Sequence, residues 1–207
     1  ATEPLWPLVI DDTVTDGSAT WKCIGKVDTI DPMPKSHLPY PVYLDETVYL
    51  AAKDSAGNAS QSIYSSGVRN PHSWNQVDFI NAQQYPDVLS AIVRHHNYIA
   101  AFGLDSLEFF YDAANATGSP LSRNESFTVR LGCPAPETIQ QTERILIFVG
   151  TSGIGNYAVY HVDNFTPKRI SDPYIERILT ANVSEIATAR AYYVRASGHL
   201  FYVLRLT

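Results

Sequence analysis

Apolar and polar residues form short blocks along the chain, and four of the apolar blocks recur at nearly even spacing. Each block is six residues long, is mainly apolar on both faces and is followed by a turn signal. The blocks begin 50, 47 and 55 residues apart, at Val48–Lys53, Tyr98–Gly103, Ile145–Gly150 and Leu200–Arg205. Apolar runs of this length are typical of strands buried between two layers. A repeat of about 40 to 50 residues with several strands per repeat predicts a β-propeller.

Residues 87–112 show one repeat in detail. They are interpreted as three antiparallel strands joined by very short turns. The middle strand, Tyr98–Phe102, is apolar on both faces, as a strand between two layers should be. The third strand alternates, with Leu107 and Phe109 on one face. Glu108 is therefore expected on a polar, solvated face.

The repeats predict an all-β fold, a β-propeller-like array of antiparallel blades in which three blades are whole and one is incomplete. Residues 42–207 form this array, and a further blade is expected at 113–125. Residues 1–41 contain six prolines and are expected to form a Pro-rich N-terminal arm or a partial blade. One short helix is expected near 173–180, because residues 171–173 supply an N-cap and an early proline.

Two questions about the array stay open at this level. A β-sandwich with evenly spaced hairpins gives a similar pattern, although the repeat favours the propeller. Propellers typically close with about 4 to 8 blades, so either the N-terminal segment completes a small ring or the chain is part of something larger. In both cases the two-faced strands predict nearly full burial of their large side chains. These are Tyr98, Ile99, Phe102, Ile147, Val149, Phe201 and Val203.

The composition limits the classes of function. The chain has 207 residues, of which 45% are hydrophobic, enough for one large all-β core. The net charge of -6 and the lack of a Lys/Arg cluster argue against a tight grip on nucleic acid. No apolar stretch approaches the roughly 20 residues of a membrane helix, so no membrane span is predicted, and no signal peptide is recognised. Cys23 and Cys133 are more typical of buried free thiols than of a disulfide, although pairing stays open.

No constellation of residues predicts catalysis. Residues 150–156 are rich in glycine, but no Lys-Ser/Thr follows, so a hairpin turn is expected instead of a phosphate loop. His95 and His96 are adjacent, which points their side chains apart and disfavours a metal site. Carboxylates such as Asp87 and Glu108 have no partner that spacing can place, so they are interpreted as solvated turn and edge groups. We predict no enzymatic activity, no metal site and no cofactor.

Several long runs of sequence resemble one protein family. They are Ile63–Asp87, Ile99–Gly103, Ser106–Asp112, Ala116–Arg123, Arg169–Leu179 and Gly198–Leu204. In this order they resemble the packaged-DNA stabilisation proteins of short-tailed bacteriophages. The resemblance implies a virion structural protein of the head-to-tail junction, or tail hub, that is multimeric and non-enzymatic.

The resemblance also implies partners and a location. The protein is expected to form a ring with itself, a hexamer, that docks beneath the portal and adaptor proteins and plugs or extends the DNA channel. Tail fibres or spikes are expected to attach to it, and genomic DNA is expected as a weakly held channel neighbour. The expected location is the virion, at the head-to-tail connector, with assembly in the host cytoplasm.

Two segments, 66–86 and 113–125, are expected to supply the contacts of such a ring. Long structured loops carry function more often than short turns do, and interface cores favour aromatic and Arg side chains. The candidate subunit-interface residues are Trp74, Phe79, Tyr85 and Arg123. An alternative hypothesis is a carbohydrate-binding or carbohydrate-cleaving propeller, in which Trp74, Tyr85 and Asp87 form a sugar platform. A generic interaction propeller is a third hypothesis.

Overall fold

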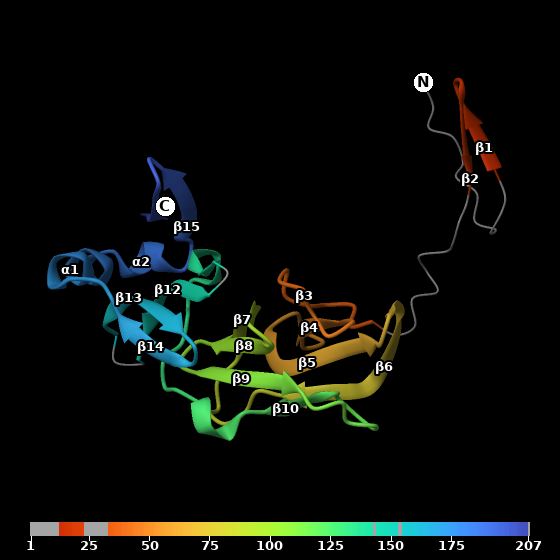
Figure 1. Cartoon of the computed structure of the whole chain (residues 1–207), viewed down its shortest axis with the longest axis horizontal. Helices are drawn as coiled ribbons and strands as arrows, with labels where there is room; N and C mark the ends of the chain where they lie inside the picture. The colour runs from red at the N-terminus through yellow and green to blue at the C-terminus, as the bar shows by residue number, and fades with distance from the viewer. Residues whose placement is uncertain (1–12, 23–32, 143, 153–154, 207) are drawn as a thin grey trace.

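Antiparallel sheets make up most of the regular structure in the computed structural model, which describes residues 13–22, 33–142, 144–152 and 155–206. Three four-stranded sheets follow one another along the chain, and a two-stranded sheet follows them. We call these sheets 1 to 4. Figure 1 shows them arranged in an arc, with a two-stranded hairpin near the N-terminus standing apart from them. That hairpin consists of β1 (Thr13–Asp16) and β2 (Ala19–Lys22).

Sheet 1 is a meander in which each strand pairs with the next. Its strands are β3 (Val42–Leu44), β4 (Thr47–Lys53), β5 (Ala59–Gly67) and β6 (Asn70–Asn81). Asp54 shapes the turn from β4 to β5, because its Oδ1 accepts hydrogen bonds from the N–H groups of Ala56 at 2.9 Å and Asn58 at 2.8 Å. Strand β6 corrects the expectation of a loop at 66–86. Its polar composition suits an outermost strand, which needs few apolar side chains.

Sheet 2 contains the three strands predicted at residues 87–112 and a fourth strand. They are β7 (Leu89–His95), β8 (Tyr98–Gly103), β9 (Leu107–Asp112) and β10 (Leu121–Arg123). The short β10 pairs with β9, with Leu121 opposite Asp112. The separate blade predicted at 113–125 is therefore wrong, because this segment completes the sheet before it.

Sheet 3 repeats the meander and is followed by helices and by sheet 4. Its strands are β11 (Gln140–Gln141), β12 (Ile145–Thr151), β13 (Tyr157–Asp163) and β14 (Thr166–Arg169). Short 3-10 helices at Glu125–Phe127 and Pro136–Thr138 precede it. The helices after it are α1 (Pro173–Ala181) and α2 (Val183–Ile186), and sheet 4 consists of β15 (Arg190–Ala196) and β16 (His199–Arg205).

The predicted helix near 173–180 is confirmed as α1. The Asp172 side chain caps it by accepting a hydrogen bond from the N–H of Ile175 at 2.9 Å, and Pro173 occupies its first turn. The second helix, α2, was not predicted. No helix in the described part of the chain is long and apolar enough to cross a membrane.

The apolar core lies between successive sheets. One cluster joins sheets 1 and 2 and includes Leu44, Tyr49 and Phe110. A second cluster joins sheets 2 and 3, where the rings of Phe102 and Phe148 lie 4.8 Å apart. The third cluster joins sheet 3 to the two helices and to sheet 4. Face-to-face stacking of four-stranded meanders in an arc is the propeller arrangement that the repeats predicted.

The burial predictions are confirmed for three of the five predicted residues in sheets 2 and 3. Ile99, Phe102 and Val149 are fully buried, whereas Tyr98 and Ile147 are half-buried. The prediction is wrong for Phe201 and Val203, which are 50% and 44% exposed. These two side chains lie on the face of sheet 4 that turns away from sheet 3, and no described element covers that face.

Candidate functional site

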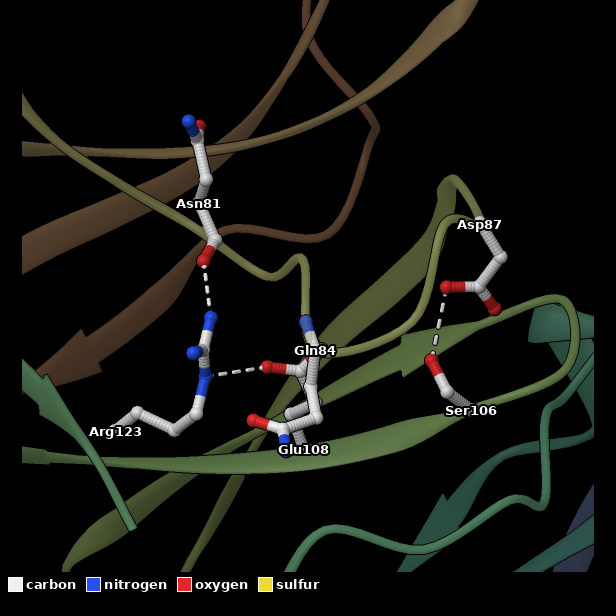
Figure 2. A network of polar contacts seen from close by, with 6 residues as sticks. All are labelled: Asn81, Gln84, Asp87, Ser106, Glu108 and Arg123. Atoms are coloured by element: carbon white, nitrogen blue, oxygen red, sulfur yellow. Dashed lines mark hydrogen bonds and ion pairs between the residues drawn. The ribbon is translucent and has the colours of Figure 1, made fainter. Parts of the chain in front are cut away.

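A buried ion pair lies where the fourth strand of sheet 2 pairs with the third. Glu108 on β9 is 1% exposed, and its Oε2 accepts a hydrogen bond from Nε of Arg123 on β10 at 2.7 Å. Its Oε1 accepts a second bond from the backbone N–H of Gln84 at 3.0 Å. Nη2 of Arg123 donates to the backbone oxygen of Asn81 at 2.7 Å. Figure 2 shows the four residues converging, so the ion pair ties the link between sheets 1 and 2 to the outer strands of sheet 2.

Strand register brings the two charges together. Arg123 lies directly opposite Phe110, so Glu108, two residues away on β9, is its diagonal neighbour on the same face. The guanidinium carbon also lies 5.7 Å from the centroid of the Phe110 ring. This face packs toward sheet 1, since Phe110 belongs to the cluster between sheets 1 and 2. The predicted alternation of β9 is therefore present, but the prediction that Glu108 is solvated is wrong.

Asp87 forms a second anchor in the same region. Its Oδ2 accepts a hydrogen bond from the backbone N–H of Asp105 at 2.8 Å, and its Oδ1 accepts one from Oγ of Ser106 at 2.9 Å. Figure 2 shows the bond to Ser106. A Cβ atom at Gly103 would lie 2.2 Å from Oδ2 of Asp87, so glycine is required there. Asp87 therefore fastens the turn between β8 and β9 to the segment that leads into β7.

The surroundings of Glu108 have opposing effects on its pKa. Burial raises the pKa, Arg123 lowers it, and Asp87 raises it, and the net direction is upward. Both carboxylates nevertheless have every oxygen engaged as a hydrogen-bond acceptor. Cavities of about 750, 470 and 450 Å³ lie elsewhere on the described surface, and none of these three is lined by Glu108, Asp87 or Arg123. These contacts, which we call the clamp, hold the segment between β6 and β7 against the outer strands of sheet 2 and against the turn between β8 and β9.

The predicted interface residues are not brought together. Trp74 lies in β6, is 5% exposed and donates from Nε1 to the oxygen of Pro71 at 2.8 Å. Phe79, also in β6, is partly exposed and packs on Tyr64 with ring centroids 5.2 Å apart. Tyr85 is half-buried beneath the guanidinium of Arg130, and Arg123 belongs to the clamp. A buried Trp74 offers no platform for a sugar, and the role of these residues at an interface stays a prediction.

The described histidines lie apart from any cluster that could bind a metal ion. His95 is buried, its Nε2 contacts the backbone oxygen of Asn164, and burial lowers its pKa. Among the described residues, no group of three or more His, Cys, Asp or Glu side chains could hold a metal ion. Residues 153–154 of the glycine-rich segment lie outside the described residues. The same is true of Cys23, whereas Cys133 is a buried free thiol.

Part of the clamp could not be found from sequence. Asn81 and Gln84 take part through backbone atoms. Since other residue types carry the same backbone groups, the sequence does not single out these two positions. Gly103 gives a weak signal, because a glycine at the end of a buried strand indicates close backbone approach.

Comparison with known proteins shows that the clamp lies in a part of the chain that matches a known family. A family model described as "Bacteriophage P22 Gp10, beta-propeller" matches residues 47–207. The matched span begins at the first residue of β4 and contains the clamp. No curated protein sequence matches the chain.

Proposed function

Since the chain belongs to the phage family of packaged-DNA stabilisation propellers typified by bacteriophage P22 Gp10, we propose that it is a structural subunit of the head-to-tail junction. In this role it plugs or extends the portal channel once packaging is complete and so keeps the genome inside the head. The observation that carries the proposal is the family match, which covers most of sheet 1 and the whole of sheets 2 to 4. Membership of this family makes the protein a virion component.

The polar chemistry of the fold supports a structural role without enzymatic activity. The two inward carboxylates, Glu108 and Asp87, hold neighbouring backbone segments and turns in place. A general acid or a nucleophile needs an oxygen that a substrate can reach. Each carboxylate oxygen of Glu108 and Asp87 instead accepts a hydrogen bond from within the protein. This arrangement suits a structural subunit of a particle.

The charge balance supports loose contact with DNA. The chain has a net charge of -6, with 15 Lys and Arg residues against 21 Asp and Glu residues. A protein that grips DNA needs unpaired Lys and Arg side chains, because its affinity comes from neutralised phosphates. In our proposal the duplex therefore passes as a weakly held neighbour in the channel.

The proposal assigns separate roles to two parts of the chain. Residues 1–41 act as an arm, and residues 42–207 act as the propeller-like domain. Copies of the domain form a hexameric ring beneath the portal and adaptor proteins, and tail fibres or spikes attach to the ring. Phe79 and Tyr85 keep enough exposure to contact a neighbour. Trp74 and Arg123 are largely buried, so they contribute indirectly, by supporting the structure around Phe79 and Tyr85.

Virions provide the test of this function. Cryo-imaging combined with quantitative mass spectrometry is expected to find the protein as one hexameric ring at the connector. Particles that lack the protein are expected to package DNA and then release it, as measured by nuclease-accessible DNA after packaging. Copies scattered over the capsid, or mutant particles that retain their DNA normally, would contradict the proposed function.

A further inference from the structure

A cavity of about 450 Å³ lies between the first strand of sheet 2 and the first strand of sheet 3. Five described residues line it, and the side chain of each carries an N–H or O–H group that can donate a hydrogen bond. We call these residues the donor pocket. They are Arg94 in β7, His96 and Asn97 in the turn that follows, Tyr98 in β8 and Gln141 in β11.

None of the five residues of the donor pocket is an Asp or Glu. The chain as a whole has 21 Asp and Glu residues against 15 Lys and Arg residues. The cavities of about 750 and 470 Å³ include Asp54 and Glu176 among their lining residues. The donor pocket therefore combines a permanent cation with four further donors in a chain that is acidic overall. This combination favours an anionic ligand.

The guanidinium group of Arg94 is held in place but is not neutralised. Its Nε donates a hydrogen bond to the backbone oxygen of His96 at 3.0 Å, and its Nη1 donates to the backbone oxygen of Tyr43 at 3.5 Å. It forms no ion pair with a carboxylate in the described part of the chain. Nη2 forms no hydrogen bond to a described residue, so its two N–H groups are available to a ligand.

The other four side chains of the donor pocket also have free donors. Their polar atoms form no hydrogen bond within the described residues, and none of these atoms is buried. Two of the rings are nevertheless fixed by packing. The His96 ring lies 4.4 Å from the ring of His95, and the Tyr98 ring lies 4.6 Å from that of Phe165. The donors are thus partly ordered and open to a ligand.

We propose that the donor pocket binds a phosphate group. A guanidinium group forms charge-assisted hydrogen bonds to phosphate oxygens, and the amide and hydroxyl donors add neutral ones. The donors come from two sheets and so approach a ligand from more than one direction. A phosphate group offers oxygens in a tetrahedral arrangement, whereas a carboxylate offers two oxygens in one plane. The phosphate group therefore matches the donors better.

The size of the cavity leaves room for part of the molecule that carries the phosphate. Its volume of about 450 Å³ lies within the range of about 300 to 1,000 Å³ that is typical of small-molecule sites. The carrier can be a free nucleotide or the backbone of DNA. One phosphate contact per chain is compatible with loosely held DNA, because affinity for DNA increases with the number of neutralised phosphates. The inference goes beyond the proposed function and does not depend on it.

Titration of the full-length protein, followed by heteronuclear NMR, tests the site. The probes are inorganic phosphate, glutarate as a dicarboxylate and a short DNA duplex, all at constant ionic strength so that charge screening is the same. We expect phosphate to cause saturable shifts in the backbone N–H signals of His96 and Asn97. The side-chain amide signals of Asn97 and Gln141 should shift with them. We expect glutarate to bind at least about tenfold more weakly than phosphate.

A matched pair of variants locates the site. Gln141→Glu places a carboxylate in the donor pocket, whereas Gln76→Glu makes the same change in the 750 Å³ cavity, which is lined by Lys35 and Lys53. Both glutamines are exposed, and their side chains form no hydrogen bond within the described residues, so both variants should fold. We expect Gln141→Glu to weaken phosphate binding about tenfold and Gln76→Glu to change it by less than about twofold.

Two substitutions of Arg94 test the role of its guanidinium group. Arg94→Gln should weaken phosphate binding by about tenfold or more. Arg94→Lys should restore part of the affinity, because lysine keeps the charge but lacks the planar fork of donors. Thermal melts check that each variant is folded. If Arg94→Gln unfolds the turn that it supports, Gln141→Glu decides the test.

The results separate the sources of phosphate and can overturn the inference. Binding of phosphate without binding of the duplex supports the site and assigns it to a free phosphate or nucleotide. Duplex binding that Gln141→Glu weakens assigns it to the DNA backbone, and Arg94→Gln should then reduce the slope of log affinity against log salt by about 1.

Three results would contradict the phosphate site. They are the lack of a saturable response to phosphate and duplex, an effect of Gln76→Glu equal to or larger than that of Gln141→Glu, and glutarate binding as tight as phosphate binding. Virion imaging is independent of these titrations, so failure of the site and failure of the proposed function are distinguishable.

Discussion

Among substitutions of polar residues, removal of Arg123 is expected to be one of those that destabilise the fold most. In Arg123→Met the side chain keeps most of its apolar volume but loses the guanidinium group. Glu108, which is 1% exposed, then keeps only the N–H of Gln84 as a hydrogen-bond donor, and the oxygen of Asn81 loses its donor. Removing one partner of a buried ion pair costs about 3 to 5 kcal/mol in the free energy of unfolding.

A matched control separates burial from charge. Arg69 and Glu46 also form an ion pair, with a distance of 2.6 Å, but their side chains are 75% and 46% exposed. Arg69→Met should therefore change the free energy of unfolding by only about 0 to 1 kcal/mol. The second change Glu108→Gln removes the buried charge and keeps an oxygen for Gln84. The double variant Arg123→Met/Glu108→Gln should thus recover about 1 kcal/mol or more relative to Arg123→Met.

Urea denaturation followed by fluorescence at several pH values measures these differences. The pKa of Glu108 is raised in the folded protein, so the folded state holds a proton more tightly than the unfolded state does. Loss of Arg123 raises this pKa further. The destabilisation of Arg123→Met should therefore be small below about pH 4.3, the ordinary pKa of Glu, and grow as pH rises. Equal effects of Arg123→Met and Arg69→Met, or an effect independent of pH, would refute the reasoning.

Three further predictions concern buried groups. Phe102→Ala should lower the free energy of unfolding by about 3 to 5 kcal/mol, whereas Leu104→Ala, at a 43% exposed position, should have a much smaller effect in the same denaturation assay. The depressed pKa of His95 means that the unfolded state binds more protons, so stability should fall as pH drops below about 6.5. His95→Gln should flatten that slope in thermal melts, and an unchanged slope would assign it to another group. Burial raises the pKa of the Cys133 thiol to about 12, so peptide mapping should find it alkylated only after unfolding; rapid labelling of native protein would contradict this.

Much of the fold follows from local sequence. The two-faced apolar runs place β4, β8, β12 and β16 correctly in the chain. For β4, β8 and β12 the reason is that a buried strand needs apolar side chains on both faces, whereas one face of β16 is exposed. The α1 helix follows from its own cap at Asp172. These features depend on residues close together in the chain, which is why a single sequence predicts them.

The errors have a common physical cause, which is that burial depends on distant partners. Glu108 has the spacing of a solvated strand residue, but its cation comes from Arg123, 15 residues later, and its second donor comes from a backbone group at Gln84. Phe201 has the spacing of a core residue, but a core position needs a covering layer that periodicity does not supply. Strand β6 was missed because an outermost strand is defined by its pairing with β5 more than by its composition.

The stacking of sheets 1 to 4 determines how the chain can fold. Each sheet is built from strands that are consecutive in sequence, so its internal contacts close short loops and form quickly. Each apolar cluster, in contrast, needs two neighbouring sheets. During synthesis one sheet can therefore form as it leaves the ribosome, and its apolar face is covered once the next sheet has formed. Stability then propagates from neighbour to neighbour, as in repeat proteins, and a lesion between sheets 1 and 2 leaves the contact between sheets 3 and 4 largely intact.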